Sequence, residues 1–368
     1  MPSCPLLGCG LILPPPRWPS NDARPQSALV LTGRAQAQSS QQLREGDQMS
    51  LGRVLVERFP QDVLDWLAER VDIVSVDPWV EPEQWEIEAP QVDAVISRKG
   101  KITREHLELS NGRLKLIART GVGVDPSRVD LDACKEHRVW VTNMPGSNSV
   151  SVAELVFGQM IALVRHTMDA NRAVREGRWA DYMQFLGTEL AGKTLGIVGF
   201  GNIGTRVALR ARAFEMDFLA TDPYILDAPV TSLGGQRVPL DELLAASDLV
   251  TIHCPLNAET KGMIGDRELA LMKPTAYIIN AARGGIIDED ALYRALNNKT
   301  IAAAAVDVVA DEPLRGDHPL LHVDNVIFSP HIGAVTVEAS SRGECGAAEE
   351  VVRVLEGKPP KNPVISFD

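Results

Sequence analysis

The sequence predicts an α/β protein made of two doubly wound parallel-sheet (Rossmann-like) domains with a cleft between them. Short apolar runs that look like buried strands alternate with helix-like stretches, which is typical of a parallel sheet covered by helices. A long helical stretch interrupts the alternation once, and the pattern then starts again. A chain of 368 residues is long enough for two such domains.

The first 48 residues have a different composition from the rest of the chain. They contain Pro14-Pro15-Pro16 and a Gln/Ser-rich stretch over 36–42. Such a segment cannot bury enough apolar surface to offset the entropy of ordering, so we expect a disordered leader over 1–48. Met49 directly precedes the first strand-like run, and our hypothesis is that the native chain begins there.

The first repeat of the pattern follows this leader. Its apolar runs are short and continuous, as in strands that are buried on both faces of a parallel sheet. We expect strands at 54–56, 73–76, 93–97 and 116–119, with a helix at 62–70.

A long helical stretch, roughly Ser149 to Glu176, separates the two repeats. The second repeat has the same character as the first. The last helix, roughly 335–355, could return the chain to the first domain. Beyond the separating helix we expect strands at 194–198, 218–221, 249–252, 276–279, 303–306 and 326–328 and a helix at 203–214.

Composition excludes several classes of function. The formal net charge is −12 and no run of Lys or Arg occurs, so we expect no nucleic-acid partner. No stretch approaches the roughly 20 apolar residues that span a bilayer, so we expect no membrane partner. The five cysteines are scattered without a C-x-x-C pair, which argues against disulfides and structural zinc and favours the cytoplasm.

A glycine-rich turn indicates a dinucleotide site. Gly199, Gly201 and Gly204 form a G-x-G-x-x-G pattern between the strand at 194–198 and a helix, and Asp222 follows after the next strand. The glycines allow a tight turn, close approach to a pyrophosphate and helix–strand packing, while the helix N-terminus attracts the phosphates. A carboxylate at Asp222 accepts ribose hydroxyls and repels a 2′-phosphate, so NAD is expected rather than NADP.

Five segments, in order, resemble the signatures of the D-isomer-specific 2-hydroxyacid dehydrogenases, and the resemblance covers roughly residues 50–368. Asp222-Pro-Tyr224 is most similar to the phosphoglycerate dehydrogenase and hydroxypyruvate reductase branch. The chain ends soon after Asn362, so we expect the C-terminal regulatory domains of long phosphoglycerate dehydrogenases to be absent. The five segments are Leu190–Gly204, His253–Leu256, Ile279–Gly285, Val306–Leu314 and Ser329–Gly333.

The resemblance implies the domain boundaries and the cofactor residues. A substrate-binding domain is expected over 49–148 plus 331–368, and an NAD-binding domain over 149–330. The cofactor residues it implies are Gly199, Gly201, Asn202, Ile203, Gly204, Asp222, His253, Cys254, Pro255, Ala281, Arg283, Asp307 and His331.

Reduction of a 2-oxo acid needs a cation for the carboxylate, a polarised carbonyl and a proton donor. Arg283 matches the catalytic arginine of the family, and its forked guanidinium can grip carboxylate and carbonyl oxygens together. His331 matches the acid/base, and Glu312 matches the acid that orients the ring and favours its charged form. Formate dehydrogenases, which resemble the family, carry an amide at the position of Glu312.

The resemblance also implies a set of residues that bind the substrate. Val122 and Gly123 lie in a loop whose amides hold the substrate carboxylate, but the stretch 125–130 is about one residue longer than is common. Arg98 could bind a second anionic group or be a solvated surface residue. The full set of substrate residues is Arg98, Val122, Gly123, Arg283 and His331, with Asn143 and Ser149 as weaker candidates.

Two further patterns have less specific interpretations. Asp307 matches a position beside the nicotinamide carboxamide, although a strand-end acid can also cap a helix. His318 and His322 are spaced like a metal pair, but Pro319 lies between them, and we expect no metal.

The expected function is therefore an NAD-dependent dehydrogenase for a small D-2-hydroxy or 2-oxo acid, of the 3-phosphoglycerate, hydroxypyruvate or glyoxylate class. An NAD-sensing corepressor of the same family is the alternative, because such proteins can keep all three catalytic residues. A third hypothesis is that the chain is a dehydrogenase related to this family that is specific for phosphite or another substrate that is not a 2-hydroxy acid. We also expect a homodimer, from the apolar runs Leu155–Phe157 and Met160–Val164 and from the aromatic residues Trp179 and Tyr182.

Overall fold

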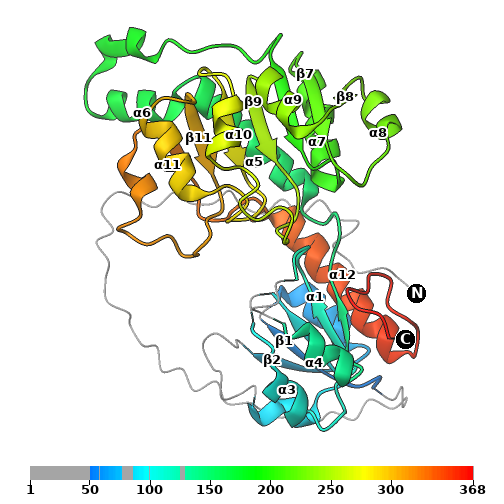
Figure 1. Ribbon diagram of the computed structural model, residues 1–368. Helices are drawn as coiled ribbons and strands as arrows, with labels where there is room; N and C mark the ends of the chain where they lie inside the picture. Colours follow the sequence, from blue (N-terminus) through cyan, green and yellow to red (C-terminus); the bar gives the residue numbers. More distant parts are fainter. Residues whose placement is uncertain (1–49, 58, 77–85, 99, 125–128, 368) are drawn as a thin grey trace. The chain divides into compact units, whose positions relative to one another are not determined.

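A computed structural model describes residues 50–57, 59–76, 86–98, 100–124 and 129–367. The chain forms two compact units, shown in Figure 1. Unit 1 consists of the described residues of Met1–Ala118, Asp125–Thr142 and Glu344–Asp368, and unit 2 of Arg119–Val124 and Asn143–Gly343. The predicted leader over 1–48 lies outside the described residues, as does most of the loop at 125–130.

Unit 1 is built on a five-stranded sheet with the order β2-β1-β3-β4-β5. The pairs with recorded register are parallel, as the continuous apolar runs predict. The strands are β1 (Arg53–Glu57), β2 (Asp72–Val76), β3 (Ala94–Ser97), β4 (Leu116–Arg119) and β5 (Trp140–Thr142). The helices are α1 (Gln61–Ala68), the 3-10 helix η2 (Ala89–Gln91), α3 (Arg104–Leu109) and α4 (Leu131–Glu136).

Unit 2 is built on a seven-stranded parallel sheet with the order β12-β11-β10-β9-β6-β7-β8. The order reverses beside β6, because the chain continues to β7 on one side and later returns to β9 on the other. The strands are β6 (Thr194–Val198), β7 (Asp217–Thr221), β8 (Gln236–Arg237), β9 (Leu249–Ile252), β10 (Tyr277–Asn280), β11 (Ala303–Val306) and β12 (Val326–Phe328).

Helices lie between the strands of unit 2, and the predicted fold class of two doubly wound sheets is confirmed. The last helix, α12 (Val337–Leu355), begins in unit 2 and ends in unit 1. The others are α5 (Ser149–Val164), α6 (Thr167–Arg175), η3 (Trp179–Phe185), α7 (Asn202–Ala213), α8 (Asp227–Thr231), α9 (Leu240–Ala246), α10 (Asp266–Leu271), α11 (Glu289–Asn297) and η4 (Pro319–His322).

The long helical stretch expected over 149–176 is observed as two helices, α5 and α6, with a break between them. The helix ends at Val164, and His166 takes a left-handed conformation with φ +50° before α6 begins. The returning chain explains the break, since the amide of Thr188 donates to the Val164 carbonyl at 2.9 Å. Gly187 packs so tightly on the Val164 carbonyl that a Cβ has no room there. This contact between residues far apart in sequence cannot be read from helix periodicity.

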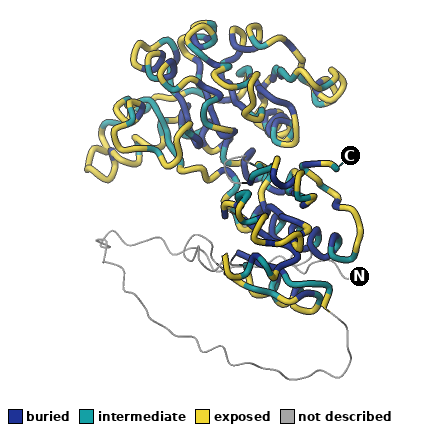
Figure 2. The backbone as a smooth tube through the Cα atoms, turned by 60° about the horizontal axis from the view of Figure 1, so that its bottom comes forward, coloured by how far each residue is buried: buried dark blue, intermediate teal, exposed yellow. Residues whose placement is uncertain are grey.

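The apolar face of α5 is used inside unit 2. Val156, Phe157, Met160 and Leu163 are buried in the hydrophobic cluster that packs against β6 and α7. Most of the apolar side chains on which the homodimer prediction rested therefore fill the core of their own unit, and the homodimer stays a prediction. Figure 2 shows the buried backbone concentrated in the interior of each unit.

No helix within the described ranges is both long and apolar enough to cross a bilayer.

Candidate active site

The predicted site residues of unit 2 lie almost entirely at one edge of its sheet. The glycine turn follows β6, His253 follows β9, Arg283 follows β10, and His331 follows β12. These strands are neighbours in a parallel sheet, so their carboxyl ends meet at the same edge. Ligands of open α/β sheets bind at this edge, beside the strand-order reversal, which here falls between β6 and β9.

The glycine turn is shaped by close backbone contact with the next strand. Gly199 has φ +91°, and a Cβ there would lie only 2.6 Å from the amide nitrogen of Cys254. Gly204 has no room for a Cβ against the carbonyl of Gly199, whereas a Cβ on Gly201 would meet nothing within 4 Å. Two glycines are thus required for packing, and the third leaves open space above the turn.

Asp222 supports the same turn from the end of β7. One carboxylate oxygen accepts the Phe200 amide and the other accepts the Tyr224 amide, both at 2.9 Å. These bonds fix the carboxylate beside the glycine turn. Each oxygen keeps a further lone pair for a hydroxyl donor.

His253 is enclosed at the end of β9. Its Nε2 lies 2.9 Å from Thr251 Oγ1, and its Nδ1 is buried without a hydrogen-bond partner among the described residues. Burial lowers the pKa of His253 to about 3, so the ring is neutral at physiological pH. Burial likewise raises the pKa of the neighbouring Cys254 thiol to about 11, which makes a reactive thiolate at Cys254 unfavourable.

These features fit a dinucleotide. Within the described ranges no side chain caps the N-terminus of α7 at Gly201, so the amides of its first turn are available for an anionic pyrophosphate. Asp222 is fixed where an acidic residue receives the ribose hydroxyls. The enclosed Nδ1 of His253 is a polar atom that still lacks a partner. Gly199, Gly201, Asn202, Ile203, Gly204 and Asp222 are the residues that would hold the cofactor.

Arg283 lies in a turn that is organised by the strand before it. The side chain of Asn280, which is buried, donates to the Arg283 carbonyl at 3.0 Å and accepts the Ala282 amide at 3.1 Å. The guanidinium donates through Nη1 to the Ala282 carbonyl at 2.6 Å. Gly284 leaves no space for a Cβ against the backbone of Val309. The turn is therefore held from both sides.

The loop at 121–124 lies against Arg283. Arg283 Nη2 occupies the position that a Cβ on Gly123 would need, so a larger residue there would displace the end of the Arg283 side chain. Asn143 donates through Nδ2 to the Val122 carbonyl at 2.6 Å and thereby holds the loop. The structure thus brings three predicted substrate residues, Val122, Gly123 and Arg283, together within unit 2.

His331 and Glu312 form the ion pair that the sequence predicts. The distance between His331 Nδ1 and Glu312 Oε2 is 2.8 Å, and both side chains remain partly exposed. Glu312 comes from the loop after β11 and His331 from the turn after β12. A carboxylate on Nδ1 leaves Nε2 as the nitrogen that can exchange a proton with a substrate.

Comparison with known proteins agrees with this geometry. Residues 157–333 match the description "D-isomer specific 2-hydroxyacid dehydrogenase, NAD binding domain". A hydroxypyruvate reductase from Thermotoga maritima is 41% identical over 72% of this chain and 86% of its own. This chain belongs to the D-isomer specific 2-hydroxyacid dehydrogenase family.

Longer proteins and proteins of solved structure also resemble this chain. A D-3-phosphoglycerate dehydrogenase from Methanocaldococcus jannaschii is 42% identical over 81% of this chain and 56% of its own. The chain spans 49–59% of the length of the phosphoglycerate dehydrogenases it matches. A glyoxylate reductase from Paecilomyes thermophila has a TM-score of 0.75 and 29% identity, covering 85% of this chain and 98% of that one.

One solved relative carries the cofactor. The NAD-dependent formate dehydrogenase from Staphylococcus aureus, solved in complex with NAD, has a TM-score of 0.74 and 30% identity, covering 86% of this chain and all of that one. Family membership establishes unit 2 as an NAD-binding domain of the 2-hydroxyacid dehydrogenase type. The roles of individual side chains remain predictions that follow from their geometry.

Asp307 has a different environment from a helix cap. Its buried carboxylate accepts the hydroxyl of Ser329, the amide of Ile332 at 2.9 Å and the amide of Gly333 at 2.9 Å. Its carbonyl accepts the amide of His331 at 2.8 Å. Asp307 therefore organises the turn that presents His331, and its predicted contact with the cofactor stays a prediction.

Arg98 belongs to unit 1. It follows β3, and its guanidinium lies 3.7 Å from the buried carboxylate of Glu344 on α12. Burial raises the pKa of Glu344, while Arg98 acts in the opposite direction. The backbone here is held by Glu57, which accepts the amide of Arg98 at 2.7 Å. Arg98 thus has a carboxylate close by, and its role in binding substrate stays a prediction.

The remaining predicted residues have ordinary positions at this edge. Ala281 is buried after β10, Pro255 is exposed and its carbonyl accepts Thr260, and Ser149 is buried at the start of α5. His318 lies 3.0 Å from Glu289. No cluster of three or more metal-ligating side chains occurs among the described residues.

Sequence reasoning missed residues that support the site without matching a catalytic motif. Asn280 holds the Arg283 turn, Ser329 bonds to Asp307, and Glu289 holds the loop of Glu312. Asn280 could have been found, since a buried polar residue at a strand end needs a partner in the next turn. Glu289 gave no signal, because an acidic residue in the first turn of a helix is common.

Proposed function

We propose that this protein is an NAD-dependent oxidoreductase that transfers a hydride between NAD(H) and C2 of a small D-2-hydroxy or 2-oxo acid. The 2.8 Å pair of His331 and Glu312 carries the proposal. It lies at the same edge of the sheet as Arg283 and the glycine turn. A proton donor, a forked cation and a dinucleotide turn are the three elements that reduction of a 2-oxo acid requires.

The residues of this chain would divide the work as follows. Arg283 binds the substrate carboxylate and polarises the C2 carbonyl, because its forked donors reach two oxygens. His331, in its charged form, donates the Nε2 proton to the oxygen on C2 during reduction, and the neutral ring accepts that proton during oxidation. Glu312 keeps the ring in place and stabilises its charge. Bound NADH supplies the hydride.

The experiment that tests this function is a panel of steady-state assays on the full chain. Glyoxylate, hydroxypyruvate, phosphohydroxypyruvate, pyruvate and a bulky 2-oxo acid are each supplied with NADH. We expect turnover with at least one small acid, and His331→Asn is expected to lower it by about 10²–10⁴, the usual contribution of acid–base catalysis. No NADH oxidation with any member of the panel would overturn the proposal.

The class of substrate is proposed from the relatives. The curated relatives carry the names D-3-phosphoglycerate dehydrogenase and hydroxypyruvate reductase, and a solved one is a glyoxylate reductase. Small acids with a polar or phosphorylated C3 are therefore the first candidates. We also place the enzyme in the cytoplasm, on the scattered cysteines of the sequence.

Cofactor choice follows from Asp222. Its carboxylate is fixed beside the glycine turn by two amides at 2.9 Å, so a 2′-phosphate would meet a fixed negative charge. We expect NADH to be preferred over NADPH by at least about tenfold, or ~1.4 kcal/mol. Asp222→Ala should narrow this preference. Equal use of the two cofactors by the wild type would contradict it.

A homodimer is part of the proposal, supported by the segment after α6. Trp179, Tyr182, Met183 and Leu186 expose between 62% and 76% of their surfaces in and after η3, which lies at the end of a segment that projects from unit 2 in Figure 1. Aromatic residues and methionine are enriched in interfaces, and this much apolar exposure needs a partner surface. A second copy of the chain is the simplest one.

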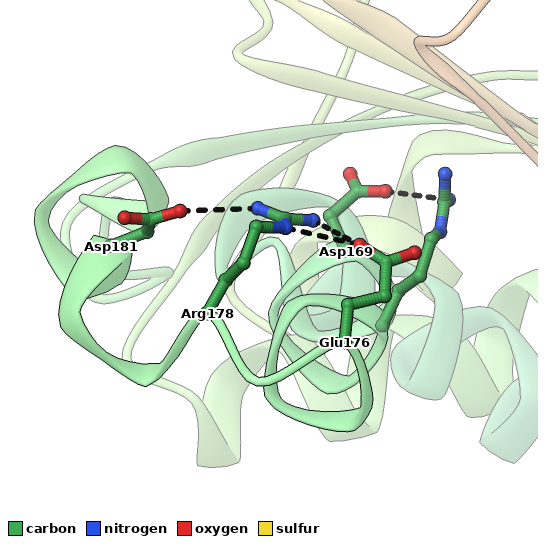
Figure 3. A network of polar contacts seen from close by, with 5 residues as sticks. Asp169, Glu176, Arg178 and Asp181 are labelled. Atoms are coloured by element: carbon green, nitrogen blue, oxygen red, sulfur yellow. Dashed lines mark hydrogen bonds and ion pairs between the residues drawn. The ribbon is translucent and has the colours of Figure 1, made fainter.

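Ion pairs shape the same segment. Arg178 binds Glu176 at 2.6 Å and Asp181 at 3.3 Å, and a further arginine, Arg172, binds Asp169 at 2.8 Å, as Figure 3 shows. Arg178 thereby links the end of α6 to η3, whereas the pair of Arg172 and Asp169 lies within α6. Light scattering of the full chain at micromolar concentration should give twice the chain mass. A monomer there, or a dimer unaffected by Trp179→Glu, would contradict this interface.

A further inference from the structure

The loop that carries Glu312 is attached to helix α11 at both of its ends. The loop, residues 310–318, lies between β11 and η4 and is largely exposed. At its start the amide of Ala310 donates to Glu289 Oε1 at 2.6 Å, and at its end His318 Nε2 lies 3.0 Å from Glu289 Oε2. A single carboxylate therefore binds both ends.

The hydrogen bonds of His318 define which of its ring nitrogens carries the hydrogen. The amide of Leu320 donates to His318 Nδ1 at 3.3 Å, so Nδ1 accepts and Nε2 carries the hydrogen. His318 thus donates to Glu289, and Glu289 acts as an acceptor on both of its oxygens. A carboxylate has this capacity, whereas a glutamine offers only one acceptor oxygen.

Glu289 is held in place by the well-anchored start of helix α11. It is the first residue of α11, where the side chain of Asp288 caps the helix by accepting the Ala291 amide at 2.9 Å. The helix is anchored by buried residues such as Leu292, and the Glu289 side chain is only 18% exposed. A negative charge in the first turn of a helix is also favoured by the helix dipole.

The start of the loop is held from the other side as well. Gly284, in the turn of Arg283, packs so closely on Val309 and Ala310 that a Cβ has no room. Ala310 therefore lies between the Arg283 turn and Glu289. Two residues further along, Glu312 reaches His331 Nδ1 at 2.8 Å.

We propose that Glu289 is a positioning residue, which holds the loop so that Glu312 faces His331. This inference rests on the proposed function, in which His331 exchanges a proton with substrate. Charged groups that bear on the His331 ring are Glu312, its direct partner, and Asp307, whose carboxylate binds the amides that follow His331. Loss of Glu289 releases the loop, and the ring then loses its partner.

The test compares Glu289→Ala with Glu289→Gln and with a matched control, Glu268→Ala. Glu268 accepts the Gly265 amide at 3.0 Å in the first turn of α10, so its loss removes a similar bond away from the loop. Glu289→Ala should lower turnover in reduction by roughly tenfold to a hundredfold, the effect of a misplacement near 1 Å. NADH affinity should be unchanged, Glu289→Gln should be intermediate, and Glu268→Ala should keep the wild-type turnover.

A double-mutant cycle separates positioning from stability. In a Glu312→Gln background, Glu289→Ala should change turnover by less than about twofold, because the residue it positions no longer carries the charge. His318→Gln, which keeps a donor, should rescue most of the loss seen in His318→Phe. Full additivity of the two glutamate substitutions would overturn the inference.

A second readout does not depend on turnover. Hydrogen exchange of the Ala310 amide, which donates to Glu289 Oε1, should be faster in Glu289→Ala than in the wild type and in Glu268→Ala. If the wild type reduces no acid of the panel, the proposed function fails while this exchange measurement still tests the inference. If the wild type is active and neither amide exchange nor turnover responds to Glu289→Ala, the inference fails and the proposed function stands.

Discussion

The neutral, enclosed histidine after β9 leads to a quantitative expectation. Burial lowers the pKa of His253 to about 3, against about 6.5 for an unfolded histidine. A group whose folded pKa is depressed contributes stability above its unfolded pKa and loses it as the pH falls toward the folded value. His253 should therefore make the protein less stable in mild acid, starting near pH 6.5 and continuing toward pH 3.

The magnitude follows from proton linkage. Between pH 7.5 and pH 5 the unfolded ring takes up a proton and the folded ring does not, which costs about 2 kcal/mol of unfolding free energy. A ring with a pKa of about 3 is almost entirely neutral at pH 5, so the loss of stability is set by the protonation of the unfolded ring.

The assay is urea unfolding followed by circular dichroism at several pH values, for the wild type and for His253→Gln. Glutamine does not titrate, and its amide nitrogen can replace the bond from Nε2 to Thr251 Oγ1, which is 2.9 Å long. The other histidines contribute equally to both proteins. The stability difference between them should change by about 2 kcal/mol from pH 7.5 to pH 5. Parallel curves across this range would refute the reasoning.

Three further expectations follow from the structure. Gly123→Ala should lower activity by roughly tenfold to a hundredfold with little change in NADH affinity, because the added Cβ displaces Arg283 Nη2; wild-type kinetics would contradict it. Glu344→Gln should raise the melting temperature at pH 7–8 and not below pH 4, because burial raises the pKa of Glu344 and destabilises its charged form despite Arg98. A change of about 1 kcal/mol in the free energy of unfolding corresponds to roughly 2–4 °C in melting temperature. Arg283→Lys should lower substrate affinity and turnover together, because lysine keeps the charge but loses the forked donors, and wild-type kinetics would contradict this role.

Local pattern was enough for most of the fold. The strands predicted at 54–56, 73–76, 93–97 and 116–119 each coincide with an observed strand to within about two residues. The same is true of each strand predicted between residues 194 and 328. Buried parallel strands are apolar on both faces, so their sequences stand out without knowledge of their neighbours. The glycine turn was equally clear, because backbone conformation at Gly199 and close packing at Gly204 exclude other residues.

Tertiary contacts decided the features that local pattern missed. The break between α5 and α6 depends on Thr188, which binds the Val164 carbonyl from a distant segment. The buried side chains of the apolar runs in α5 pack inside unit 2 itself. Helical periodicity reports that one face is apolar, and it does not report which surface covers that face.

The sequence by itself determined the family, the positions of most strands and the dinucleotide turn, and it pointed to Arg283, Glu312 and His331. Only the tertiary structure decided how these side chains are held. Asn280 and Glu289 act through bonds to the backbone and side chains of other segments, which any residue with a suitable acceptor or donor could form. Such bonds depend on distance in space and leave no fixed spacing in the sequence, whereas a glycine that no other residue can replace leaves its mark directly.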